Sequence, residues 1–254
     1  MLLAIDIGNT NIVLGAFEGD RLVESWRVGT KTSITSDEYA MILKDLFGFR
    51  GIEFKQIQGI VISSVVPPLL PVMTEMSRAF FGIEPMIVTS ELKTGITFRY
   101  DNPKEIGADR IVNAAAAFKQ FGGPLIIVDF GTATTFCAIT KNGEYLGGAI
   151  VPGIKISAEA LFQRASKLPR FELVKPATVI GRDTVSAMQA GMLYGYAGLV
   201  DGIVERMKRE LSQDARVVAT GGLAELVAPE TKSIQDIRRH LTLEGLWLLY
   251  ELNR

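Results

Sequence analysis

The sequence LLAIDIGNTNIVLGAFEGDRLVESW at residues 2–26 is matched by LIIVDFGTATTFCAITKNGEYLGGA at residues 125–149. Each stretch has four apolar residues, an aspartate, one apolar residue, a glycine and a patch rich in threonine or asparagine. The aspartate and glycine of the second copy, Asp129 and Gly131, lie 123 positions after those of the first. Two apolar runs joined by a turn follow in both copies, so the sequence predicts the same β-hairpins twice.

The repeat predicts two copies of one domain, because its period is close to half of the 254 residues. The cluster Gly122-Gly123-Pro124 interrupts regular structure between the copies. We therefore expect an N-terminal domain over residues 1–122 and a C-terminal domain over residues 123–254. The alternative is a chance similarity between two buried hairpins.

Strand-like and helix-like segments are mixed in both halves, which predicts the α/β class. The predicted strands are Leu2–Ile5, Ile12–Phe17, Gly59–Ser63, Met86–Val88, Leu125–Val128, Thr135–Ile139 and Val217–Ala219. The predicted helices are Asp37–Phe47, Leu69–Phe81, Ile111–Phe121 and Thr184–Leu211.

The composition excludes several classes of function. With 27 basic and 28 acidic residues, the chain lacks the positive charge that nucleic-acid binding requires. One Cys and one His exclude disulfide frameworks, cysteine-cluster zinc sites and two-histidine metal sites, and fit a reducing compartment. The absence of any G-x-G excludes the Rossmann and protein-kinase glycine loops. No signal peptide and no apolar stretch of about 18 residues occur, so we expect a cytoplasmic protein without a membrane partner.

The two Asp-Gly-Thr hairpins have the chemistry of a phosphate site. Asp6 and Asp129 each end an apolar run, and a glycine two residues later permits a tight turn. Residues 9–11 and Thr132 add polar side chains and backbone N–H donors that can surround phosphate oxygens. Each carboxylate can then face a cation that bridges those phosphates. The alternative is that each aspartate merely caps its own turn.

Two further segments carry candidate functional residues. Residues 217–223 predict a buried strand that runs into a Thr-Gly-Gly turn. The glycines would let the backbone approach a ligand such as adenine or ribose closely. Alternatively, the segment is a plain strand-to-helix turn. In YDNPKEIGADR, residues 100–110, Asp109 and Arg110 fall at the start of a predicted helix. Asp109 can act as a base and Arg110 can pair with an anion. Alternatively, Asp109 caps the helix and Arg110 is a surface charge.

Together these motifs resemble a known superfamily. DIGNTN at residues 6–11, DFGTATT at 129–135 and ATGGL at 219–223 are similar to the two phosphate loops and the adenosine motif of the superfamily of acetate kinases, sugar kinases, Hsp70 and actin. The resemblance implies two duplicated RNase-H-like domains of the actin-like ATPase fold. They would have mixed sheets and an inter-domain cleft that binds ATP.

Over nearly its whole length the chain closely resembles the type III pantothenate kinase family. Besides the motifs above, GGAIVPG at residues 147–153 and IGRDT at residues 180–184 carry the resemblance. It implies an enzyme that phosphorylates pantothenate with ATP to 4′-phosphopantothenate, the first step of coenzyme A biosynthesis. Magnesium would enter with the nucleotide.

The resemblance also implies a role for particular residues. Asp109 would be the general base, and Asp129 would bind a monovalent cation, K⁺ or NH₄⁺. The implied pantothenate contacts are Tyr100, Gly107, Ala108, Asp109, Arg110 and Thr184. The implied ATP contacts are Asp6, Ile7, Gly8, Asn9, Thr10, Asn11, Ile12, Val13 and Thr132.

A glycine stripe raises the question of a dimer. Gly191, Gly195, Gly198 and Gly202 share one face of a predicted helix, where another backbone can approach closely. That backbone belongs either to the same chain or to a second copy, and the family resemblance implies a homodimer. Two other functions remain open: a different superfamily enzyme, such as a polyphosphatase or a sugar kinase, and an ATP-binding regulator without catalysis.

Overall fold

The computed structural model describes residues 1–254, which form two compact units. Unit 1 consists of Met1–Gly95, Asp101–Ala116 and Leu241–Arg254, and unit 2 of Ile96–Tyr100 and Ala117–His240. Both units are therefore discontinuous in sequence, unlike the continuous halves 1–122 and 123–254 that the repeat suggests. The C-terminal segment packs with the N-terminal sheet rather than with the segment that precedes it.

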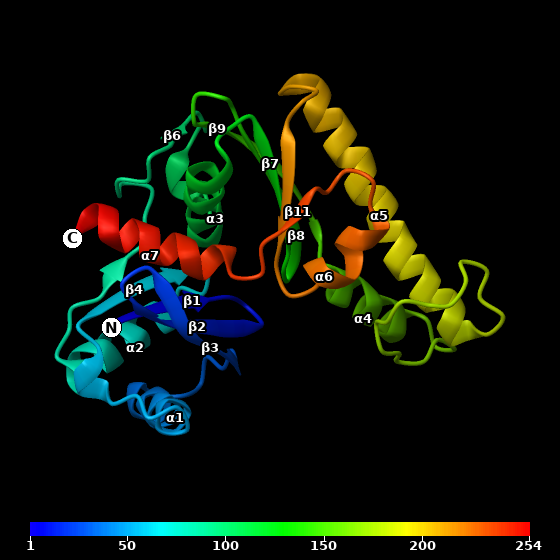
Figure 1. Cartoon of the computed structure of the whole chain (residues 1–254). Coiled ribbons are helices and arrows are strands. Elements are labelled where there is room, and N and C mark those ends of the chain that lie inside the picture. Colours follow the sequence, from blue (N-terminus) through cyan, green and yellow to red (C-terminus); the bar gives the residue numbers. More distant parts are fainter. The chain divides into compact units, whose positions relative to one another are not determined.

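Strands and helices are mixed along the whole chain (Figure 1). The strands are β1 (Leu2–Ile7), β2 (Asn11–Glu18), β3 (Arg21–Gly29), β4 (Gly59–Ser64), β5 (Met86–Ile87), β6 (Thr97–Phe98), β7 (Leu125–Phe130), β8 (Ala133–Ile139), β9 (Glu144–Pro152), β10 (Arg216–Thr220) and β11 (Asp236–Ile237). The α-helices are α1 (Ser36–Gly48), α2 (Leu69–Met76), α3 (Ala108–Phe121), α4 (Ile154–Arg164), α5 (Thr184–Glu210), α6 (Ala224–Val227) and α7 (Leu241–Asn253). Short turns of helix are η1 (Phe54–Gln56), η2 (Ser77–Phe81), η3 (Pro103–Glu105) and η4 (Ala228–Glu230).

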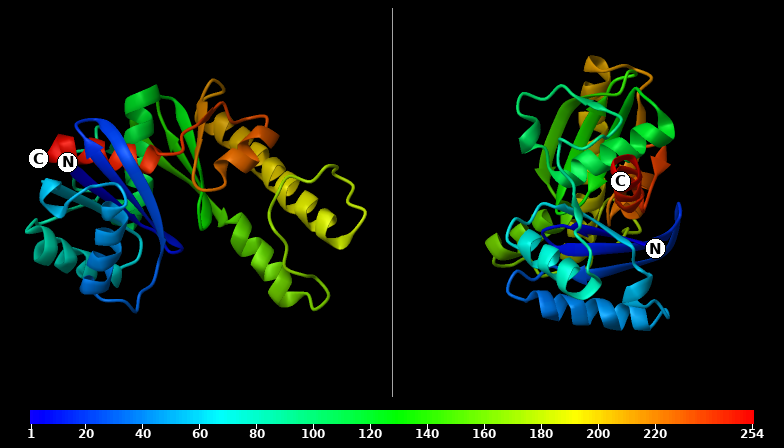
Figure 2. Two further views of the ribbon diagram at one scale, coloured as in Figure 1. Left: turned by 60° about the horizontal axis from the view of Figure 1, so that its bottom comes forward. Right: turned by 90° about the vertical axis from the view of Figure 1, so that its left-hand side faces the viewer.

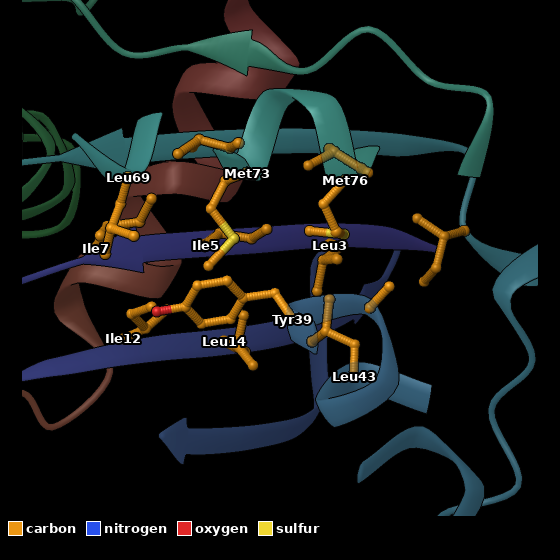
Figure 3. Close-up of a cluster of buried hydrophobic side chains, with 14 of the residues drawn as sticks. Leu3, Ile5, Ile7, Ile12, Leu14, Tyr39, Leu43, Leu69, Met73 and Met76 are labelled. Atoms are coloured by element: carbon orange, nitrogen blue, oxygen red, sulfur yellow. The ribbon is translucent and has the colours of Figure 1, made fainter. Parts of the chain in front are cut away.

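Unit 1 is built on a five-stranded sheet of order β3-β2-β1-β4-β5. β1 pairs antiparallel with β2 and parallel with β4, so the aspartate at the end of β1 lies beside the end of β4. Helices α1 and α2 cover one face, and their apolar side chains meet those of β1 and β2 in a buried core (Figure 3). That core includes Leu3, Ile5, Ile7, Ile12, Leu14, Tyr39, Leu43, Leu69, Met73 and Met76.

The C-terminal helix α7 packs on the strands of unit 1, as two views of the ribbon show (Figure 2). It contacts β1, β2 and β4. It also lies against α3, where a Cβ on Gly245 would be 2.5 Å from the carbonyl oxygen of Val112. A helix that packs on two sides needs apolar residues around most of its surface. The apolar sequence of α7 therefore suits its place in this core.

Unit 2 repeats the strand arrangement of unit 1. Its sheet has the order β11-β10-β7-β8-β9-β6, in which the first five strands correspond to β5, β4, β1, β2 and β3. The strand pairing shifts register after Ala16 in β2 and after Ala138 in β8, which are equivalent positions of the two hairpins. The burial patterns of β1 and β7 are identical. The predicted α/β fold with duplicated mixed sheets is therefore confirmed.

The helices agree with the predictions in position more than in length. The predicted helix Leu69–Phe81 changes geometry at Met76, and a wider turn, η2, continues to a glycine at position 82 with a left-handed backbone. Helix α3 begins at Ala108, three residues earlier than predicted. None of the helices combines the length and the apolar character needed to span a lipid bilayer.

Candidate active site

The first Asp-Gly-Thr turn lies at the end of β1 in unit 1. The backbone N–H of Gly8 donates to the Asn11 carbonyl at 3.0 Å and closes the turn, which leaves Asn9 and Thr10 exposed. Parallel pairing of β1 with β4 places Ser63 opposite Asp6, and the Ser63 hydroxyl donates to Asp6 Oδ1. The neighbouring strand β4 thus orients the Asp6 side chain through Ser63. This differs from the alternative in the sequence analysis, in which Asp6 would cap its own turn.

Asp6 has an unusual electrostatic environment. Burial raises the pKa of its carboxyl from 3.8 to about 7, the hydrogen bond from Ser63 opposes this rise, and the charge of Asp109 adds to it. The effect of Asp109 means that the two carboxyl groups lie within electrostatic reach of each other in unit 1. Perturbed carboxyl groups that lie together are typical of catalytic sites.

Asp109 lies in the first turn of α3. Its Oδ1 accepts a hydrogen bond from the Arg110 backbone N–H at 2.8 Å. Burial raises the pKa of Asp109 above its usual value, although that hydrogen bond and the Arg110 charge oppose the rise. Gly107 leaves room for the carboxylate, because a Cβ there would lie 2.5 Å from Oδ1. Asp109 therefore contacts the helix start, as the capping alternative predicted, and its raised pKa suits a general base.

Arg110 is not a solvated surface charge, since only 7% of the residue is exposed. The carbonyl of Gly107 accepts hydrogen bonds from the N–H groups of Arg110 and Ile111 at 3.0 and 3.1 Å, so residues 107–110 form one compact turn at the start of α3. A buried guanidinium beside a helix N-terminus is a site where an anion would be stabilised.

The second Asp-Gly-Thr turn lies in unit 2, between β7 and β8. Gly131 N–H donates to the Ala133 carbonyl at 3.1 Å, so this turn is one residue shorter than the first. Asp129 pairs with Thr220 of β10, the position that Ser63 holds opposite Asp6. A Cβ on Gly221 would overlap Asp129 Oδ1, so only glycine lets the Thr-Gly-Gly backbone pass this carboxylate.

Two further predicted residues also lie in unit 2. Tyr100 packs over Gly147, where a Cβ would be 3.1 Å from the tyrosine ring, and its ring centroid is 6.2 Å from that of Tyr145. Thr184 is exposed and begins α5, after the N-cap Asp183 that accepts a hydrogen bond from Ser186 N–H at 2.9 Å.

The predicted site residues therefore divide between the two units. Unit 1 carries the turn of residues 6–13 and the segment 107–110, and unit 2 carries Tyr100, Asp129, Thr132 and Thr184. Ser63 was missed by the sequence analysis. Its signal is a hydroxyl side chain at the end of a strand parallel to β1, which is recognisable only after the strands are paired.

Comparisons with known proteins identify the family of the chain. A family model described as type III pantothenate kinase matches residues 2–206. A type III pantothenate kinase of Geobacter sulfurreducens is 56% identical over 254 residues, which is 100% of both chains. One of Geotalea uraniireducens is 58% identical over 254 residues, covering 100% of this chain and 99% of the relative.

A solved structure shares the fold at low sequence similarity. The inorganic polyphosphate/ATP-glucomannokinase of Arthrobacter sp. strain KM superposes with a TM-score of 0.54 at 15% identity, and covers 98% of that chain and 99% of this one. This likeness confirms the fold of sugar kinases, whereas the family follows from the full-length relatives. By both the family model and those relatives, the chain belongs to the type III pantothenate kinase family.

Proposed function

We propose that this protein transfers the γ-phosphoryl group of ATP to the primary hydroxyl of pantothenate, giving 4′-phosphopantothenate for coenzyme A synthesis. The observation that carries the proposal is the combination in unit 1 of a phosphate turn with Asp109, whose charge acts on Asp6. Two full-length relatives named type III pantothenate kinase, at 56% and 58% identity, support the choice of substrate.

The roles of the residues follow from their chemistry. Asp109 accepts the proton of the substrate hydroxyl, and its raised pKa makes it a stronger base than an exposed aspartate. Arg110 pairs with the pantothenate carboxylate. Phosphoryl transfer depends mostly on positioning and charge neutralisation, and a general base contributes about 10²- to 10⁴-fold.

The two turns bind ATP. Residues 6–13 and Thr132 supply backbone N–H groups and side-chain oxygens to the phosphates. Magnesium would enter with the nucleotide and would supply positive charge to neutralise the phosphates. Tyr100, Gly107, Ala108 and Thr184 complete the pantothenate contacts.

A monovalent cation, K⁺ or NH₄⁺, binds at Asp129 in this proposal. The donor chemistry fits, because a carboxylate oxygen is a hard ligand and Asp129 lies near the end of β7, where the backbone of Gly221 comes close to it. Turnover should be several-fold faster in potassium than in sodium buffer at equal ionic strength. Equal rates in the two buffers would exclude the cation requirement.

The protein acts as a homodimer through α5. A Cβ on Gly191, Gly195 or Gly198 would have no neighbouring atom within 4 Å, so intrachain packing does not account for these glycines. Helix-interior glycines each cost up to about 1 kcal/mol relative to alanine, which favours a second copy as the element that packs here. The single cysteine, Cys137, is buried and its sulfur accepts a hydrogen bond from the Tyr145 hydroxyl. A chain with one cysteine forms no internal disulfide, in keeping with a cytoplasmic protein.

The decisive experiment is a coupled assay of ADP release with pantothenate, Mg²⁺ and K⁺. We expect pantothenate-dependent ADP release by the parent protein, and a loss of about 10²-fold or more in kcat for Asp109→Asn without loss of thermal stability. An Asp109→Asn variant within a few-fold of the parent would refute the base assignment. Nucleotide binding without pantothenate-dependent ADP release would instead favour a regulator.

A further inference from the structure

Thr30 joins the end of β3 to the first phosphate turn. The last residue pair between β2 and β3 is Asn11 with Gly29, and Thr30 follows directly. Its hydroxyl donates to the Gly8 carbonyl at 2.6 Å, and its backbone N–H donates to the Thr10 carbonyl at 3.1 Å. One residue therefore holds two of the carbonyl groups in the turn of residues 8–10.

These two hydrogen bonds determine which backbone groups face a ligand. The peptide bond after Gly8 is trans, since the one cis peptide of the chain is Gly123-Pro124. In a trans peptide the C=O and N–H groups point in opposite directions. Binding the Gly8 carbonyl to Thr30 therefore turns the Asn9 N–H away from Thr30, in a turn whose tip is exposed. Outward N–H groups in such a turn bind anions.

Thr30 is itself connected to the core of unit 1. The Tyr39 hydroxyl donates to the Lys31 carbonyl at 2.9 Å and accepts from the Lys31 N–H at 3.4 Å. Tyr39 is only 2% exposed and packs among the side chains of β1, β2 and α2 (Figure 3). The residue next to Thr30 is thus fixed by a buried side chain of α1.

The second phosphate turn lacks this hydroxyl. Gly153 follows β9 as Thr30 follows β3, and its N–H donates to the Thr132 carbonyl at 3.1 Å, the same backbone bond. A Cβ on Gly153 would overlap the Thr132 carbonyl oxygen and lie 2.7 Å from that of Gly131. The backbone bond therefore belongs to both copies of the fold, whereas the hydroxyl bond to Gly8 is special to the first turn.

We propose that Thr30 is a positioning residue for ATP: its hydroxyl holds the Gly8–Asn9 peptide with the N–H directed at the phosphates. The proposal rests on the proposed function for the ATP role of residues 6–13. It predicts an effect on ATP and little effect on pantothenate, because both hydrogen bonds of Thr30 go to the turn of residues 8–10, which belongs to the proposed ATP contacts.

The test compares Thr30→Val, which keeps the β-branched shape, with Thr30→Ser, which keeps the hydroxyl. Loss of one oriented hydrogen bond predicts a KM for ATP about tenfold higher in Thr30→Val, with the KM for pantothenate within about twofold of the parent. Thr30→Ser should restore the parent KM for ATP. Thr74→Val is the matched control, because the Thr74 hydroxyl donates to the Leu70 carbonyl at 2.8 Å within α2.

Two results would contradict the proposed role of Thr30 in positioning ATP. An unchanged KM for ATP in Thr30→Val, or equal losses in Thr30→Val and Thr74→Val, would give Thr30 only a structural role. Calorimetric binding of a non-hydrolysable ATP analogue with Mg²⁺ separates this inference from the proposed function. If the parent binds the analogue but releases no ADP with pantothenate, the proposed function is wrong. Weaker binding of the analogue by Thr30→Val, but not by Thr74→Val, would still support the role of Thr30 in positioning ATP.

Discussion

Asp6, a residue of the proposed phosphate site, lowers the stability of the fold when its carboxyl is charged. Its carboxyl is largely removed from water, near Asp109, and its pKa rises to about 7. A carboxyl with a raised pKa binds its proton more tightly in the folded than in the unfolded state. The folded protein therefore loses stability as pH rises from the ordinary value of 3.8 towards 7, and the loss persists at higher pH.

Asp6→Asn should accordingly stabilise the protein at alkaline pH. The amide keeps an oxygen that can accept the Ser63 hydroxyl but carries no charge. The gain in unfolding free energy should be of the order of 1–3 kcal/mol at pH 8 and close to zero at pH 4. Urea unfolding at the two pH values measures it. Asp20→Asn, in an exposed turn, is the control, and a gain for Asp6→Asn that does not depend on pH would contradict the assignment.

Single residues were predictable where the sequence repeats them. Asp6 and Asp129 were identified because two copies of one pattern place an aspartate at the same position. Ser63 and Thr30 were not, because each acts through a strand neighbour that is distant in sequence. Asp6 lies 57 positions from Ser63, and the parallel pairing of their strands follows from the three-dimensional fold.

At the scale of elements, the hairpins were predictable and the last helix was not. Alternation and turn residues are local signals, so the β1–β2 and β7–β8 hairpins follow from the sequence. Helix α7 belongs to unit 1 because it packs on β1, β2 and β4. Local sequence patterns do not predict these contacts, because the partners are distant in sequence. The close packing instead depends on glycines such as Gly245, set against the backbone of α3.

Gly245→Ala tests that packing by the sign of its effect. Alanine stabilises an unconstrained helix by about 1 kcal/mol relative to glycine. Here the new methyl group would meet the Val112 carbonyl oxygen at 2.5 Å, so we expect a net loss of about 1–3 kcal/mol of stability. Urea unfolding midpoints measure it. Gly48→Ala in α1, where nothing lies within 4 Å, should be neutral or slightly stabilising. Stabilisation by both substitutions would mean that α7 does not pack closely.

At the scale of the whole molecule, the two units share their strand arrangement and differ in the residues of the proposed site. The corresponding strands and the register shifts recur in both units. The proposed base and its arginine occur only at the start of α3, and the Thr30 hydroxyl bond only at the first turn. The open glycine face of α5 likewise belongs to unit 2 alone, which makes it a candidate for contact between copies.

The proposed dimer predicts a mass near twice the 27.7 kDa of the chain in size-exclusion chromatography with light scattering. Gly195→Gln should reduce the measured mass to that of the monomer, because a long polar side chain on this helix face would keep the backbone of a second copy away. Within its own chain the new side chain is tolerated, because no atom lies within 4 Å of a Cβ at this position. Gly48→Gln, with the same replacement at an open glycine of α1, should leave the mass unchanged. A monomeric parent, or a dimeric Gly195→Gln variant, would exclude this face as the interface, since close helix contact requires the glycine surface.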